Sequence, residues 1–293
     1  MRAQLCRLAA LTSILFVLAA SAAHAYTAAG DRVFPALMSL PQIAPTDEAY
    51  LQANTQPTAD GRSTNLATAY SKTLTERWGI QVEGSYNWFD RKRASSVSGW
   101  NNSELSVRYL AVVDLEREFL LTVGVHQEFG GTGNRRVGAD PEGATTPTLY
   151  FGKGLGDLDI GYLRPLAILG NVGYEAANGG ARADRQVGGI AIQYSIPYLV
   201  SKVDSIQLPD FLRSMTPMVE ISYATQTTGP GQSTAVTVAP GITYAGESWE
   251  LGVEALVPAT RAAGTGTGVM LQFHLSLDFL FPNSLGRPLF GAR

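Results

Sequence analysis

Residues 78–88 read W-G-I-Q-V-E-G-S-Y-N-W, and apolar side chains alternate with polar residues or glycine along the whole stretch. A period of two is typical of a β-strand whose two faces meet different surroundings. Trp78 and Trp88 stand at the two ends of the apolar face, and indole rings favour the interfaces of a bilayer. A strand of this length, tilted by about 40°, spans roughly 25 Å, the height of the lipid-facing band of an outer-membrane barrel. The stretch predicts a transmembrane strand, although strands of soluble β-sandwiches also alternate.

The start of the chain has the features of a secretory signal. Arg2 and Arg7 precede an apolar run at residues 8–20, and Ala23-His24-Ala25 offers a small-x-small cleavage site. The one cysteine, Cys6, lies inside this signal, so we expect no disulfide or thiol chemistry after cleavage. No later run approaches the roughly 20 apolar residues of a membrane helix, so entry into a bilayer requires a closed barrel.

The net charge and the mean hydropathy of the chain agree with a membrane barrel. Without Arg2 and Arg7, the 22 basic residues become 20 against 25 acidic ones, a formal charge of about −5, which argues against nucleic-acid binding. The mean hydropathy is only +0.02, as expected when half of each strand faces lipid and half faces the lumen.

Alternation and turn signals predict an all-β fold, a transmembrane antiparallel β-barrel of about twelve strands. The expected strands are 48–56, 64–74, 78–90, 103–114, 118–129, 146–153, 157–174, 186–198, 216–226, 234–245, 249–259 and 268–281. The strand at 157–174 contains Pro165 and is expected to be bent or bulged. The predicted divisions are a signal peptide at 1–25, an Ala- and Pro-rich segment at 26–45, the barrel at 46–281 and a periplasmic tail at 282–293. The segment at 26–45 is either a periplasmic tail or a plug inside the barrel.

Tight connections such as T-E-R, L-E-R, G-L-G and G-E-S alternate with long polar ones. This asymmetry is typical of outer-membrane barrels, whose short turns face the periplasm, and it predicts both chain ends there. The connection at 199–215 breaks the pattern, and its D-S-I-Q-L-P-D-F-L stretch predicts a short amphipathic helix.

Several phrases resemble a family of uncharacterised proteobacterial outer-membrane barrels, itself similar to the proposed transporters of meta-pathway phenol degradation. The phrases are G-K-G-L-G-D-L at 152–158, Y-L-R-P-L-A-I at 162–168, Q-Y-S-I-P-Y-L at 193–199, Pro240-Gly241, V-E-A-L-V-P at 253–258 and H-L-S-L-D-F-L-F-P-N-S-L-G-R-P-L-F at 274–290. The resemblance covers about residues 47–290. It implies an outer-membrane barrel with a transport role and no catalytic residues.

If apolar side chains face lipid, the opposite parity of each strand faces the lumen. The charged candidates for the lumen are Glu83, Glu104, Arg108, His126, Glu128, Glu220, Glu250, Glu254, His274 and Asp278. Their balance is acidic, which predicts either a water-filled path for cations and polar solutes or a set of polar groups that merely fill the barrel. Trp78, Trp88 and Trp249 are the predicted interface aromatics.

Enzymatic alternatives find little support in these positions. His274 and Ser276 share one strand face, as a base and a nucleophile can, but that face points to the lumen rather than to lipid. Glu250 and Glu254 lie four residues apart on one strand, about 13 Å, which is too far for a glycosidase pair. His126, Glu128 and His274 could hold a metal, but a paired polar interior is the better prediction. We therefore expect no enzyme, cofactor or metal.

The sequence thus predicts a barrel of the bacterial outer membrane that passes or takes up small solutes, among them small aromatic or hydrophobic compounds if the resemblance holds. The alternatives are a filled, structural barrel and, less favoured, an outer-membrane lipid hydrolase. The expected partners are outer-membrane lipid, lipopolysaccharide, a small-molecule solute and the outer-membrane assembly machinery.

Overall fold

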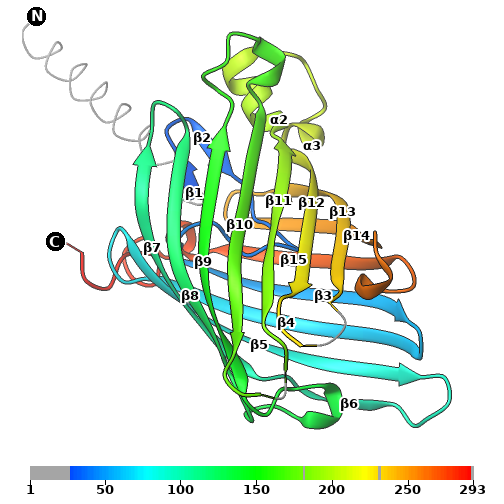
Figure 1. Cartoon of the computed structure of the whole chain (residues 1–293). Helices are drawn as coiled ribbons and strands as arrows, with labels where there is room; N and C mark the ends of the chain where they lie inside the picture. The colour runs from blue at the N-terminus through cyan, green and yellow to red at the C-terminus, as the bar shows by residue number, and fades with distance from the viewer. Residues whose placement is uncertain (1–26, 181, 230–231, 292–293) are drawn as a thin grey trace, which may run out of the picture.

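The computed structural model describes residues 27–180, 182–229 and 232–291. The predicted signal peptide at 1–25, and Tyr26, lie outside the described residues. Within them, twelve antiparallel strands form a closed ring, because β15 pairs with β3 and β4 pairs with β5 (Figure 1). The strands are β3 (Glu48–Thr58), β4 (Gly61–Thr73), β5 (Trp78–Arg91), β7 (Ser103–Asp114), β8 (Phe119–Phe129), β9 (Gly143–Gly154), β10 (Leu166–Ala177), β11 (Arg185–Tyr194), β12 (Met215–Gln226), β13 (Thr234–Ala245), β14 (Trp249–Pro258) and β15 (Gly268–Ser276).

The two rims of the barrel carry different additions. A hairpin of β1 (Thr27–Ala29) and β2 (Arg32–Phe34) contacts residues of the connections 115–118 and 155–165. The same rim carries α2 (Ile196–Tyr198), η3 (Leu199–Val203) and α3 (Asp210–Arg213), and it includes tight turns at 74–77 and 246–248. We call it the periplasmic rim, because short turns face the periplasm in outer-membrane barrels. At the outer rim β6 (Val97–Trp100) extends the sheet beside the end of β5.

The outer face of the barrel is apolar and its inner face is polar, as β15 shows. Val269, Leu271 and Phe273 are 46%, 51% and 41% exposed, whereas the intervening Gln272 and His274 are 3% exposed. Because the ring is closed, every strand in it has a hydrogen-bonded neighbour on both sides. The backbone N–H and C=O groups are therefore satisfied without water where the outer face meets lipid. The chain is therefore a transmembrane β-barrel of the bacterial outer-membrane type.

An arginine in place of Leu271 is expected to lower the free energy of unfolding by about 2 to 4 kcal/mol, because Leu271 lies midway along β15 on the lipid face. Leu115→Arg is the matched control, since Leu115 is 60% exposed in the periplasmic turn 115–118. Urea unfolding of both refolded variants in lipid vesicles measures the difference. Equal stability of the two would contradict the assignment of faces.

Two predicted strands extend well beyond the strands of the structure. The strand expected at 157–174 begins only at Leu166, because its neighbours β9 and β11 end at Gly154 and Tyr194; Pro165 also lacks an N–H to donate. The strand expected at 186–198 ends at Tyr194, since the Ser195 hydroxyl caps α2 by accepting from the backbone N–H of Tyr198. The G-L-G turn is therefore part of a longer connection at 155–165 that includes η2 (Gly161–Leu163).

The last strand also ends earlier than predicted. β15 stops at Ser276 because its partner β3 begins opposite, at Glu48, and a helical turn α4 (Leu277–Leu280) follows. Asp278 consequently lies on α4 rather than on a strand of the barrel wall, which corrects its predicted place, and burial raises the pKa of its carboxyl to about 6. The connection at 199–215 holds the short helical segments η3 and α3 instead of one amphipathic helix. In the described part of the chain, no helix has the length and apolar character to cross a bilayer.

Aromatic side chains gather at both ends of the lipid face. Trp78 starts β5 at the periplasmic rim and packs on Tyr109 with 4.8 Å between ring centroids. Trp88 lies near the other end of β5, 4.5 Å from the ring of Tyr86. Trp249 starts β14 at the periplasmic rim, 5.7 Å from the ring of Tyr244. Such rings at two levels fit the two interfaces of a bilayer.

Candidate functional site

Residues 35–44, which we call the lumen segment, run inside the barrel and fill part of its cross-section. Their backbone has no regular strand or helix, so its N–H groups need other acceptors. Glu220 on β12 supplies two, accepting from Met38 N–H at 2.9 Å and from Leu40 N–H at 2.7 Å. Glu250 on β14 accepts from Ala36 N–H at 3.2 Å. The acidic side chains of the lumen thus bind a backbone of this chain.

Further polar contacts of the lumen segment come from β14 and from the adjoining strands β15 and β3. The Ser39 hydroxyl donates to Glu254 on β14 at 2.5 Å. Gln272 on β15 donates to the carbonyl oxygen of Leu37 at 3.1 Å, and Gln52 on β3 donates to that of Met38 at 2.8 Å. Because Glu220, Glu250 and Glu254 are at most 1% exposed, these carboxylates do not line an open path.

Apolar side chains of the lumen segment pack on apolar positions of the inner wall. Leu37, Leu40 and Ile43 belong to one cluster with Leu120 and Leu169. Met38 belongs to a second cluster with inward residues of β12 to β15, namely Met218, Ala239, Leu256 and Met270. The barrel therefore has a hydrophobic core whose centre is the lumen segment.

Glycines on the inner wall make room for this packing. A Cβ at Gly152, Gly189 or Gly252 would collide with Ile43, Leu40 or Met38, respectively. These glycines, together with the inward Leu120, Leu169, Met218 and Met270, are residues that the sequence analysis missed. The sequence does offer a signal for them: they are apolar residues or glycines at strand positions predicted to face the lumen. A water-filled lumen would favour polar side chains at such positions.

A buried ion pair holds the lumen segment at the periplasmic rim. Arg32 on β2 pairs with Glu118 at 3.1 Å, and their side chains are 1% and 6% exposed. Arg32 also donates to the carbonyl oxygens of Arg164 and Pro165 and lies over the ring of Tyr198 at 3.9 Å. The Tyr198 hydroxyl donates to Glu118 at 2.9 Å, and burial together with this bond raises the pKa of Tyr198.

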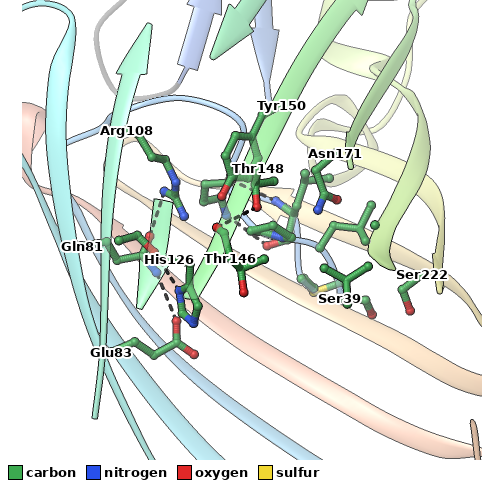
Figure 2. Close-up of a pocket in the computed structure, with 18 of the residues that line it drawn as sticks. Ser39, Gln81, Glu83, Arg108, His126, Thr146, Thr148, Tyr150, Asn171 and Ser222 are labelled. Atoms are coloured by element: carbon green, nitrogen blue, oxygen red, sulfur yellow. Dashed lines mark hydrogen bonds between the residues drawn. The ribbon is translucent and has the colours of Figure 1, made fainter. Parts of the chain in front are cut away.

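A cavity of about 410 Å³, lined by both polar and apolar side chains, remains between the lumen segment and the barrel wall. The wall contributes side chains mainly from β5 to β10, and Figure 2 shows them projecting from these neighbouring strands. They include Gln81, Glu83, Ser106, Arg108, His126, Thr146, Thr148, Tyr150 and Asn171. The lumen segment contacts both sides of the wall: its polar groups bind β12 and β14, and its apolar side chains pack on Leu120 and Leu169 of β8 and β10. The cavity is the part of the lumen that the segment leaves unfilled.

The charged residues around the cavity are held mostly by neighbouring side chains. His126 on β8 lies between Ser106 Oγ, 3.0 Å from its Nδ1, and Glu104, 3.2 Å from its Nε2. Gln81 accepts from Arg108 at 2.9 Å and donates to Glu83 at 3.2 Å. Strand parity predicted inward positions for Glu83, Glu104, Arg108 and His126, but parity does not show which of these side chains meet.

The other predicted lumen residues lie apart from the cavity. His274 pairs with Glu48 on β3 at 2.8 Å, and both side chains are buried. Glu128 lies near the outer rim, where it accepts from Asn102 at 2.7 Å and pairs with Arg182 at 3.1 Å. His126 and His274 thus contact different carboxylates, and the described residues include no group of three or more His, Cys, Asp or Glu side chains placed to hold a metal ion.

Comparison with known proteins finds no matching family and no matching curated protein. Solved structures of similar architecture include the KdgM porin, at 15% identity over 78% of this chain and 98% of that chain, with a TM-score of 0.48. The NanC porin is 9% identical over 78% of this chain and 98% of that chain, again with a TM-score of 0.48. An outer-membrane channel from Pseudomonas putida F1 is 11% identical over 83% of this chain and 99% of that chain, also at 0.48. These similarities are too distant to carry an argument about function.

Proposed function

We propose that the chain is an outer-membrane channel that passes small polar solutes between its lumen segment and the wall formed by β5 to β10. The observation that carries the proposal is the cavity of about 410 Å³ between the lumen segment and these strands, whose wall is rich in polar side chains. Side-chain hydroxyl and amide groups of Thr146, Thr148 and Asn171 line it, and such groups can replace the hydration of a passing solute. A cavity of this size accommodates a molecule of metabolite size.

We propose that the chain is not a hydrolase. The row Glu104, His126 and Ser106 has the residue types of a catalytic triad. Similar polar contacts recur elsewhere on the inner wall, as between His274 and Glu48 or between Gln52 and Gln272. His274 and Ser276 are 3% and 0% exposed and belong to the buried inner face of β15, so they do not present a nucleophile to lipid.

Uptake of sugars into proteoliposomes tests the channel. We expect the full chain to admit a pentose and to exclude a tetrasaccharide, because the lumen segment fills all of the lumen cross-section except this cavity. Thr148→Trp should slow pentose entry, since Thr148 lines the cavity. Pro147→Trp is the matched control, because Pro147 is exposed on the opposite face of β9.

Equal rates for the two tryptophan variants would contradict passage through this cavity. The absence of uptake in every variant would favour the alternative of a filled, structural barrel. The resemblance to the phenol-degradation transporters supports small aromatic or hydrophobic compounds as further solutes to test in the same vesicles.

A further inference from the structure

Arg108 on β7 is a buried cation that faces the cavity of the proposed channel. The residue is 4% exposed, and its side chain lies along the wall over β8, where the facing residue is Gly124. A Cβ at Gly124 would stand 3.1 Å from Cγ of Arg108. The absence of a side chain at this position lets the guanidinium group stay close to the wall and reach the cavity (Figure 2).

The hydrogen-bonding capacity of Arg108 is only partly used. One terminal nitrogen donates to Gln81 at 2.9 Å, and the guanidinium carbon lies 5.3 Å from the ring centroid of Tyr150. Its Nε has no hydrogen-bond partner among the described residues, although a guanidinium group has five N–H donors.

The charge of Arg108 also lacks a direct counter-ion in the described part of the chain. Two other buried cations have one: Arg32 pairs with Glu118 at 3.1 Å, and Lys72 pairs with Asp47 at 2.5 Å. Arg108 forms no ion pair within 4.0 Å with any residue of the described ranges. Because buried charges are costly unless paired, an unpaired one beside a cavity indicates a site for an anion from outside the chain.

The carboxylates nearest to the cavity are engaged elsewhere. Glu175, which lines the cavity, pairs with Arg185 at 2.6 Å and with Arg182 at 3.1 Å. Glu104 and Glu48 contact His126 and His274, respectively. Glu83 lines the cavity too, but the amide of Gln81 stands between it and Arg108, accepting from Arg108 and donating to Glu83. The negative charge of Glu83 therefore reduces the affinity for an anion without occupying the free side of the guanidinium group.

We propose that Arg108 binds the carboxylate of a small organic acid in this cavity. The planar guanidinium fork matches a carboxylate better than it matches a spherical ion. The apolar part of the acid would lie against the lumen segment, where Leu37, Leu40 and Pro41 line the cavity, and beside the ring of Tyr150. The inference rests on the proposed channel and gives it a substrate class.

Isothermal titration of the refolded full chain in detergent micelles tests this site independently of transport. Hexanoate is the probe, and hexanamide is its uncharged counterpart. We expect hexanoate to bind and hexanamide to bind at least about tenfold more weakly, because hydrogen bonds to charged groups are the stronger ones. Arg108→Gln should weaken hexanoate binding by a similar factor, and Arg108→Lys should weaken it less.

Arg62→Gln is the matched control, since Arg62 is exposed near the outer end of β4 and does not line the cavity; it should bind hexanoate like the unmodified chain. Glu83→Gln should bind hexanoate more tightly, because it removes a nearby negative charge. Equal binding by Arg108→Gln and Arg62→Gln would overturn the proposal, as would displacement of hexanoate by chloride at equal concentration. Uptake of pentose without hexanoate binding would refute this site alone, whereas binding without uptake would refute only the channel.

Discussion

Removal of residues 27–45 is expected to raise the single-channel conductance of the refolded barrel severalfold in a planar bilayer. The lumen segment fills part of the lumen, and its side chains Leu37, Leu40 and Ile43 form the centre of the hydrophobic core. A closed ring of twelve strands has its own continuous hydrogen bonding, so the wall can persist without this core. Water would then enter the space that the segment leaves.

The truncated barrel is also expected to prefer cations. Glu220, Glu250 and Glu254 would lose the backbone and hydroxyl donors that they now bind and would face water as free carboxylates. Replacing all three by glutamine in the truncated chain should remove the preference, as the reversal potential in a salt gradient measures. A synthetic peptide of residues 27–45 should lower the conductance again. If truncation leaves the conductance unchanged while circular dichroism shows a folded barrel, the side chains of the wall close the lumen and the segment does not.

Arg32→Ala is expected to release the lumen segment from the periplasmic rim without removing any part of it. Breaking a buried ion pair by deleting one partner costs about 3 to 5 kcal/mol, and here Glu118 would remain buried without its cation. We expect faster proteolysis of the N-terminal segment and open-state bursts in single-channel recordings, while urea unfolding of the barrel wall changes little.

The neighbouring residue provides a close control for this variant. Asp31 pairs with Lys202 at 2.7 Å in the same hairpin region, but the two side chains are 64% and 41% exposed. An exposed pair contributes about 0 to 1 kcal/mol, so Asp31→Ala should resemble the unmodified chain in both assays. Equal proteolysis of Arg32→Ala and Asp31→Ala would show that the ion pair with Glu118 does not hold the segment.

The barrel itself was predictable because its strands follow a simple rule of alternation. The strand expected at 103–114 coincides with β7, and the one at 234–245 coincides with β13, since turn residues flank both and one face of each is polar. Alternation failed at 157–165, where the apolar residues Ile160 and Leu163 belong to a 3-10 turn at the rim. The residue pattern of this stretch cannot show that the neighbouring strands β9 and β11 do not extend beside it.

The candidate site was predictable only in part. The parity of β5, β7 and β8 placed Glu83, Arg108 and His126 on inward faces, but parity does not tell which side chains meet across strands or which remain unpaired. For residues 26–45 the sequence did not decide between a periplasmic tail and a plug inside the barrel, because an irregular backbone has no periodic pattern. The acceptors of the lumen segment lie on β12 and β14, and only the closed ring brings those strands beside residues 36–40.

This separation along the chain has a consequence for the order of assembly. Met38 and Glu220 are 182 residues apart, and Ala36 and Glu250 are 214 residues apart. The lumen segment can bind its acceptors only when β12 and β14 have joined the ring, so its apolar side chains stay exposed until then. Contacts between such distant residues form late, because a long loop must be closed before they can stabilise anything. The interior of the barrel therefore forms after its wall, although the lumen segment precedes all the wall strands in the sequence.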